Sequence, residues 1–121
     1  MDANATVQAY MARLAAGDVA GVTALFVPGA MVHSPLYGDL PAAVFYPRLA
    51  EDTRESRLSF RQLFQAQDDP SSWALRFTYH WFLADGSEKV FDCVDVLKLH
   101  EDGRIEDLTI IYDTHPRPSG Q

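Results

Sequence analysis

The chain has 121 residues, of which 47% are hydrophobic and 22% charged, values typical of a single globular domain with one core. Its net charge of -7 at pH 7 disfavours a nucleic-acid partner, which would need a basic surface, and also disfavours docking on an anionic membrane. No apolar run approaches the roughly 20 residues of a membrane-spanning helix, and the first residues lack the pattern of a secretory signal. We therefore expect one domain over residues 1–121, cytoplasmic, with neither nucleic acid nor membrane as a partner.

The first predicted element is an amphipathic helix near the N-terminus. Asp2 or Asn4 could cap its start, and Gly17 could end it. Its apolar residues recur at the spacing i, i+3, i+4 and i+7, which places them on one helix face: Val7, Tyr10, Met11 and Leu14.

Two further helices and a short strand are predicted before residue 52. Asp18 could cap a short second helix that includes Phe26, and a strand is expected near residues 30–34. Asp39 could cap the third helix, in which Pro47 removes a backbone donor and should kink or interrupt the helix. The buried face of the third helix would be formed by Ala42, Phe45, Tyr46 and Leu49.

The remainder alternates between apolar and polar residues and predicts four antiparallel strands, near 57–66, 75–83, 89–100 and 104–113. Asp-Gly and Asp-Pro turns separate them. Residues 114–121 are expected to form a frayed tail. This order predicts an α+β domain whose helices pack on one face of a curved sheet.

Within the strand near 89–100, an acid interrupts the apolar row. Every second side chain of a strand points to the same face, so Asp95 shares its face with the apolar residues of the strand: Phe91, Cys93, Leu97 and Leu99. A carboxylate is costly there unless it is paired, hydrogen-bonded or protonated. Asp95 is therefore the first candidate for function, whereas Cys93 is expected to be a plain buried thiol.

Other polar and aromatic groups should accompany Asp95 inside the domain. Taken singly, each tyrosine could be a core residue whose hydroxyl reaches a backbone carbonyl or the surface. Together, many rings around a few polar atoms are typical of a small-molecule pocket. The expected lining comprises Phe26, Ser34, Tyr46, Phe77, Tyr79, Trp81, Leu108, Ile110 and Tyr112.

Two segments carry a resemblance to a known superfamily. QAYMARLAAGDVAGVTALFVPGAMV, at residues 8–32, and DVLKLHEDGRIEDLTIIYD, at residues 95–113, resemble the nuclear-transport-factor-2-like superfamily, and within it the ketosteroid isomerase and SnoaL-like branch. The match spans about residues 4–113. It implies a cone-shaped α+β fold, in which a curved, antiparallel or mixed sheet wraps around the N-terminal helices as a cystatin-like roll. It also implies an apolar pocket and, often, a dimer.

The resemblance also implies roles for individual residues. Tyr10 and Asp95 stand where ketosteroid isomerases place two donors to a developing enolate oxygen, and Tyr46 corresponds to a further pocket tyrosine. In those isomerases an apolar site keeps the carboxylic acid neutral, so that it can donate a hydrogen bond. The general base of the isomerases, an aspartate at the end of the first strand, is replaced here by Ser34, and the adjacent His33 could serve instead. Strand alternation places His33 and Ser34 on opposite faces unless the chain bulges, and Asp39 and Asp113 are weaker candidates.

Three functional hypotheses remain open at the level of the sequence. The first is an enzyme for isomerisation, cyclisation, dehydration or hydrolysis of a small apolar compound, with Tyr10 and Asp95 polarising an oxygen and His33 moving a proton. It requires His33 and Asp95 to face the same cavity. The second is a binding module without catalysis, and the third is an interaction domain. A homodimer through the outer sheet face is expected under all three, and no metal or other cofactor is expected, because the histidines show no ligand spacing.

Overall fold

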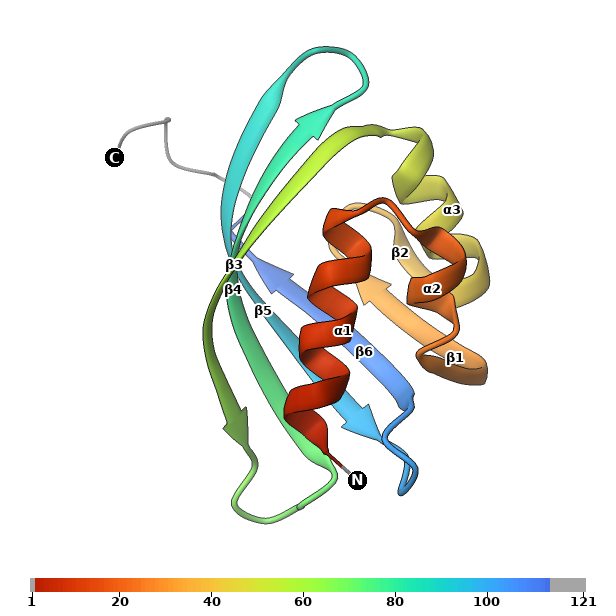
Figure 1. Ribbon diagram of the computed structural model, residues 1–121, viewed down its shortest axis with the longest axis vertical. Helices are drawn as coiled ribbons and strands as arrows, with labels where there is room; N and C mark the ends of the chain where they lie inside the picture. The colour runs from red at the N-terminus through yellow and green to blue at the C-terminus, as the bar shows by residue number, and fades with distance from the viewer. Residues whose placement is uncertain (1, 114–121) are drawn as a thin grey trace.

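A computed structural model describes residues 2–113 and contains one mixed six-stranded sheet covered on one face by three helices (Figure 1). The sheet has the strand order β2-β1-β6-β5-β4-β3, and only β1 and β6 run parallel. The elements are α1 (Ala3–Ala15), α2 (Val19–Thr23), β1 (Phe26–Ser34), β2 (Gly38–Pro41), α3 (Ala42–Glu51), β3 (Thr53–Gln65), β4 (Ser72–Leu83), β5 (Glu88–Leu99) and β6 (Ile105–Tyr112). The predicted α+β class and curved sheet are confirmed.

Helix α1 forms where the apolar spacing predicted it and packs across the inner face of the sheet (Figure 1). The side chain of Asp2 caps its start by accepting a hydrogen bond from the backbone N–H of Ala5 at 3.1 Å. Val7, Tyr10 and Met11 are buried, as their shared helix face requires. The helix thereby brings the hydroxyl of Tyr10 into the interior of the domain.

Strands β4, β5 and β6 supply much of the inner face of the sheet, and on β5 burial alternates strictly from Phe91 to Leu99. On β5, Phe91, Cys93 and Leu97 are buried, and Asp95 between them is only 1% exposed. Asp95 is paired in register with Leu75 on β4 and with Ile110 on β6, so it lies at the middle of the sheet. The predicted inward orientation of this acid is confirmed.

Several local predictions before residue 52 are wrong. Phe26 begins β1 instead of ending the second helix, because α2 stops at Thr23. Asp39 lies in β2, a strand that the sequence pattern did not predict, and α3 begins after Pro41 without any side-chain cap. Helix α3 is continuous through Pro47, since packing of its apolar face compensates for the lost backbone donor.

Among residues 2–113, no helix is long and apolar enough to cross a membrane. The cytoplasmic location expected from the sequence stays a prediction. The tail expected at residues 114–121 lies outside the described residues.

Candidate ligand pocket

A small cavity of about 50 Å³ lies between α1, α3 and the inner face of the sheet. Its wall is mostly apolar and aromatic, as in sites for small organic molecules. Eight of the residues predicted for the site line it: Tyr10, Ser34, Phe77, Tyr79, Trp81, Asp95, Ile110 and Tyr112.

The carboxyl group of Asp95 is the least satisfied polar group of this pocket. Within residues 2–113, neither of its oxygens has a hydrogen-bond partner of regular geometry. Burial raises the pKa of Asp95 to about 8, and the nearby hydroxyl of Tyr10 offsets part of that rise. A pKa of about 8 favours the protonated form of Asp95 at neutral pH, and in that form the carboxyl group is a hydrogen-bond donor.

The hydroxyl of Tyr10 is engaged chiefly with another tyrosine. Tyr10 and Tyr46 share a hydrogen bond of 2.8 Å between their hydroxyl oxygens, and both side chains are buried. Their rings also meet edge to face, with centroids 6.1 Å apart. Among residues 2–113, Tyr10 and Asp95 thus share no hydrogen bond of regular geometry, and the Tyr10 hydroxyl is paired with Tyr46 beside the carboxyl group of Asp95.

All the titratable side chains whose pKa is shifted in this pocket hold their protons at neutral pH. Burial raises the pKa of Tyr10, the pKa of Tyr79 to about 12, and the pKa of the Cys93 thiol. Burial likewise raises the pKa of Tyr37 and of Tyr112. The pocket therefore offers hydrogen-bond donors, but among residues 2–113 its lining holds no group that is ready to accept a proton at pH 7.

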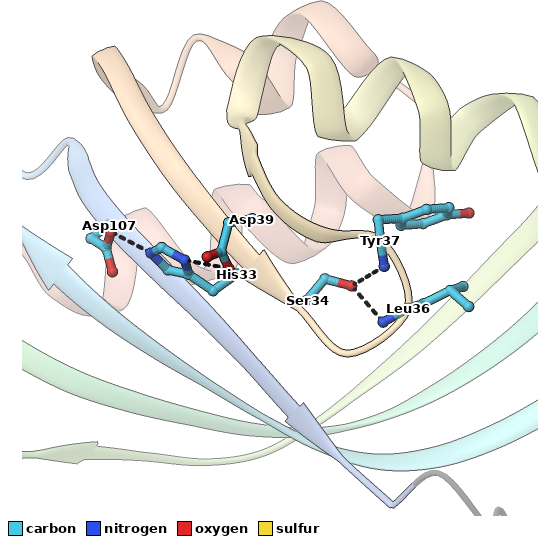
Figure 2. Close-up of polar contacts among 6 residues, drawn as sticks. All are labelled: His33, Ser34, Leu36, Tyr37, Asp39 and Asp107. Atoms are coloured by element: carbon cyan, nitrogen blue, oxygen red, sulfur yellow. Dashed lines mark hydrogen bonds and ion pairs between the residues drawn. The ribbon is translucent and has the colours of Figure 1, made fainter.

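Ser34 organises the loop between β1 and β2 at the edge of the pocket (Figure 2). Its hydroxyl oxygen accepts the backbone N–H groups of Leu36 and Tyr37, each at 3.1 Å. Both of those residues line the pocket. The hydroxyl oxygen of Ser34 is thus occupied as an acceptor and cannot serve as a base, while its O–H can still donate into the pocket.

His33 points away from the pocket, towards the outer face of the sheet (Figure 2). Its Nδ1 lies 2.9 Å from a carboxylate oxygen of Asp39, and its Nε2 lies 2.9 Å from a carboxylate oxygen of Asp107. The hydrogen bond to Asp39 is the largest cause that raises the pKa of His33, and the hydrogen bond to Asp107 is the next. Both favour the protonated imidazole, in which both ring nitrogens donate. The requirement that His33 and Asp95 face one cavity is not met, so the prediction of His33 as the pocket base is wrong. Neither Asp39 nor Asp113 lines the pocket.

Three other predicted residues lie in the core instead of in the pocket wall. Phe26 and Leu108 are buried, and Tyr46 stands behind Tyr10. The prediction missed these lining residues: Leu14, Leu36, Tyr37, Phe45, Leu49, Phe91 and Cys93. Phe91 and Cys93 share the strand row of Asp95, so alternation alone would have identified them. Tyr37 lies in a loop, where no periodicity gives a signal.

Among residues 2–113, no group of three or more His, Cys, Asp or Glu side chains is arranged to hold a metal ion. The absence of a metal or other cofactor stays a prediction.

Comparison with known proteins agrees with this fold. The family model of the SnoaL-like domain matches residues 7–108. The epoxide hydrolase/cyclase-like enzyme SalBIII, with a role in pyran ring formation in the polyether salinomycin, is 16% identical, with a TM-score of 0.81 over 94% of this chain and 92% of that chain. The Δ5-3-ketosteroid isomerase of Mycobacterium sp. is 15% identical, with a TM-score of 0.76 over 94% of this chain and 95% of that chain.

A third solved structure has a bound small molecule. It is a hypothetical protein of Catenulispora acidiphila with a ketosteroid isomerase-like fold, in complex with trimethylamine, and it is 10% identical, with a TM-score of 0.79 over 92% of this chain and 87% of that chain. At such identities the likeness shows the fold alone. No curated protein sequence matches this chain.

Proposed function

This chain belongs to the SnoaL-like domain family, and we propose that its central pocket binds a small apolar molecule bearing an oxygen acceptor. The observation that carries this proposal is the carboxyl group of Asp95, which is 1% exposed, lines the cavity and lacks a regular hydrogen-bond partner among residues 2–113. A buried polar group without a partner is destabilising. A ligand oxygen at that place would supply the missing partner.

The proton on Asp95 decides which ligands fit. A protonated carboxyl group donates to a carbonyl, ether or epoxide oxygen, whereas a carboxylate would repel such an oxygen. The aromatic wall around it, including Phe77, Trp81 and Phe91, favours an apolar body over a polar one. The ligand class is therefore a small apolar ketone, enone, ether or epoxide.

A second candidate is catalysis that starts from the same contact. The likeness to an epoxide hydrolase/cyclase-like enzyme favours it. Asp95 would give its proton to an epoxide or carbonyl oxygen as a general acid, and the resulting carboxylate would take the proton of the attacking hydroxyl group. Such a reaction needs no separate base. Abstraction of a carbon-bound proton, as in steroid isomerisation, does need a base, and Ser34 and His33 do not provide one.

Two ligands that differ only in the acceptor test the binding proposal: 2-acetylnaphthalene, a ketone, and 2-ethylnaphthalene, the matched hydrocarbon. We expect the wild-type protein to bind the ketone about tenfold more tightly in fluorescence titrations, the effect of one well-made hydrogen bond. Asp95→Leu should remove this preference and retain hydrocarbon binding. Asp95→Asn should keep the preference, because the amide still donates.

The pH dependence provides an internal control. The ketone preference of the wild-type protein should disappear as the pH rises through about 8, where Asp95 loses its proton. The preference of Asp95→Asn should not change over that range. Equal affinities for ketone and hydrocarbon in the wild-type protein, or a preference that survives in Asp95→Leu, would overturn the proposal. Turnover of an epoxide-bearing alcohol by the wild-type protein but not by Asp95→Asn would favour the catalytic candidate.

For the oligomeric state we propose a homodimer through the outer face of the sheet. Val96 is 38% exposed and Ile111 is 52% exposed on this face, beside the Arg76–Asp92 ion pair. An apolar centre with charged neighbours suits a self-complementary interface. Sedimentation should give a dimer at micromolar concentration, and Val96→Asp should shift it to monomer. A wild-type monomer under those conditions would contradict this proposal.

A further inference from the structure

The central pocket is too small for the proposed ligands as long as its wall stays in place. Its volume is about 50 Å³, whereas sites for small organic molecules usually provide about 300 Å³ or more. Asp95 itself is 1% exposed. Part of the wall must therefore move before a ligand reaches this carboxyl group, and the contacts of the wall indicate which part moves.

Most of the wall belongs to helices and strands, where packing and hydrogen bonds hold the side chains. Lining residues on α1 and β4 are hydrogen-bonded to residues behind them: Tyr10 to Tyr46 at 2.8 Å, Tyr79 to Ser56 at 2.8 Å, and Trp81 to Thr53 at 2.7 Å. Movement of these side chains would break bonds that are buried or partly buried, which is costly.

The loop between β1 and β2 is the part of the wall that is held least firmly. Among residues 2–113, only Leu36 and Tyr37 of the lining lie outside the helices and strands. Leu36 is 54% exposed and Tyr37 is half-buried, so each has one side towards the cavity and another towards solvent. The wall is therefore thin at this loop.

The backbone of the loop is nevertheless fixed. Ser34 and Gly38 pair in the ladder between β1 and β2, and the Ser34 hydroxyl accepts the backbone N–H groups of Leu36 and Tyr37 (Figure 2). Movement at the loop is thus confined to side chains. The larger of these two side chains is that of Tyr37.

The side chain of Tyr37 is held across the pocket by one hydrogen bond and two ring contacts. Its hydroxyl donates to a carboxylate oxygen of Asp52, the residue directly after α3. Its ring meets Phe45 edge to face with centroids 5.6 Å apart, and the guanidinium of Arg48 lies over it, 4.9 Å from the ring centroid. Tyr37 therefore spans the distance from the β1–β2 loop to the far end of α3.

The bond to Asp52 is easier to open than the other hydrogen bonds of the wall. Asp52 is exposed, so water can replace each partner when the ring turns away. Once this bond is open, rotation of the Tyr37 side chain is fast, because it needs no change in the backbone. The bond to Asp52 thus acts as a latch on a side chain that can turn.

We propose that Tyr37 is the gate of the central pocket and that its hydrogen bond to Asp52 keeps the gate closed. When the bond opens, the ring turns into solvent and leaves an entrance beside Leu36. The gate governs how fast a ligand enters, and Asp95 governs which ligand is preferred. The identity of the ligand rests on the proposed function, whereas the gate requires only that the pocket be reached from solvent.

Cys93 reports the state of the gate without any ligand. It is the only cysteine of the chain, is buried and lines the pocket. Methyl methanethiosulfonate, a small neutral reagent that attacks thiolates, must pass the wall to reach it. At one fixed pH, we expect Tyr37→Phe to be modified about fivefold faster than the wild-type protein, the effect of losing one hydrogen bond. The variant keeps the ring and its contacts with Phe45 and Arg48.

A double variant tests whether the latch is the bond itself. Asp52→Ala should accelerate the modification of Cys93 as much as Tyr37→Phe does. The combination of Tyr37→Phe with Asp52→Ala should be no faster than either single variant, because each of the three proteins lacks the same bond. Accelerations that multiply in the double variant would overturn the latch.

Thr6→Val is the matched control for a general loss of stability. Thr6 donates to the carbonyl of Gly103 at 2.9 Å and does not line the pocket, so this variant loses a hydroxyl hydrogen bond without touching the gate. Its Cys93 should be modified at the wild-type rate. The rate in Tyr37→Phe should vary little with low concentrations of urea, since an open gate exposes far less surface than unfolding does. Equal rates in the wild-type protein and Tyr37→Phe, or an equal acceleration in Thr6→Val, would overturn the gate.

Ligand entry separates the gate from the proposed function. In stopped-flow mixing, Tyr37→Phe should accelerate association and dissociation by the same factor for both 2-acetylnaphthalene and 2-ethylnaphthalene, and leave their affinities nearly unchanged. If Cys93 reacts faster in Tyr37→Phe while the wild-type protein binds ketone and hydrocarbon equally, the proposed function falls and the gate stands. If the ketone is preferred but the reaction of Cys93 is not accelerated, the gate falls and the proposed function stands.

Discussion

Asp95 and His33 lie on the two opposite faces of one sheet, and the contrast between them shows how burial and partners determine chemistry. Asp95 is buried on the inner face without a regular hydrogen-bond partner among residues 2–113. His33 is half-buried on the outer face and lies between two carboxylates (Figure 2). Both groups hold a proton more strongly than usual, Asp95 because its charged form is desolvated and His33 because its charged form is paired.

The difference teaches where function can reside. The proton of His33 is already shared with Asp39 and Asp107, so that side chain stabilises the sheet and offers nothing to a ligand. Among residues 2–113, the proton of Asp95 has no acceptor of regular hydrogen-bond geometry, and the surrounding cavity has room for one. A polar group that the fold leaves unsatisfied is a better guide to a binding site than a polar group with good partners.

The largest expected effect is on stability, in Asp95→Asn. A pKa of about 8 in the folded state, against about 3.9 in the unfolded state, means that folding takes up a proton between these values. The stability of the wild-type protein should therefore fall relative to that of Asp95→Asn by up to about 1.4 kcal/mol per pH unit over that range. Urea unfolding of both proteins at several pH values measures this difference.

The sign of this pH dependence distinguishes a protonated Asp95 from an ionised one in the folded protein. If Asp95 were ionised and paired in the folded protein, the wild-type protein would instead gain stability relative to the asparagine variant as the pH rises. A difference that does not vary with pH would show that the pKa of Asp95 is ordinary. Either result would break the contrast with His33.

A smaller loss of stability is expected from Ser34→Ala, at the end of β1. The variant loses the acceptor for the backbone N–H groups of Leu36 and Tyr37, and we expect unfolding to become easier by about 1 kcal/mol. Ser34→Thr retains the hydroxyl group and serves as the control. Hydrogen exchange at these two amides should accelerate in the alanine variant only, and unchanged exchange would contradict the structural role of the Ser34 hydroxyl.

Tyr46→Phe is expected to change the pKa of Asp95 by a small amount. The substitution leaves the Tyr10 hydroxyl without its present partner. That hydroxyl can then turn to the carboxyl group of Asp95, and its donation would lower the pKa of Asp95 by about one unit or less. The carboxyl carbon chemical shift of Asp95, followed against pH, measures the change. Tyr79→Phe is the control, because the Tyr79 hydroxyl is bonded to Ser56 instead. A pKa that is unchanged or higher in Tyr46→Phe would contradict the proximity of Tyr10 to Asp95.

The sequence predicted the inner face of the sheet better than the partners within it. Alternation along β5 alone determined that Asp95 points inward, and helical spacing did the same for Tyr10. The Tyr10–Tyr46 bond joins residues 36 positions apart and depends on how two helices pack, which no local pattern encodes. The volume of a cavity is likewise a property of packing alone.

The first strands were the least predictable part, for identifiable reasons. The residues of β2, Gly-Asp-Leu-Pro, have low strand propensity, and the strand forms through pairing with β1. Phe26 fits the apolar spacing of a helix, but Pro28 follows two residues later and cannot continue one. The resemblance and the near-neutral pKa of an ordinary histidine suggested His33 as the base of the site. The alternation that predicts the orientation of Asp95 places His33 on the opposite face from Ser34.

The smallest expected effect on stability is that of His33→Gln, which tests the role of His33 on the outer face of the sheet. The raised pKa of His33 means that its ion pairs stabilise the folded state fully below about pH 6.5, and that this contribution is lost as the pH rises through the folded pKa. The effect should be small and should weaken with added salt, because the side chain is 34% exposed. It is best measured in an Asp95→Asn background, where Asp95 no longer titrates. In that background the stability should decline above about pH 6.5 when His33 is present and should remain level in the His33→Gln variant.

The affinity for 2-acetylnaphthalene should be equal with and without the His33→Gln change, because His33 lies outside the pocket, and an altered affinity would return His33 to the candidate site.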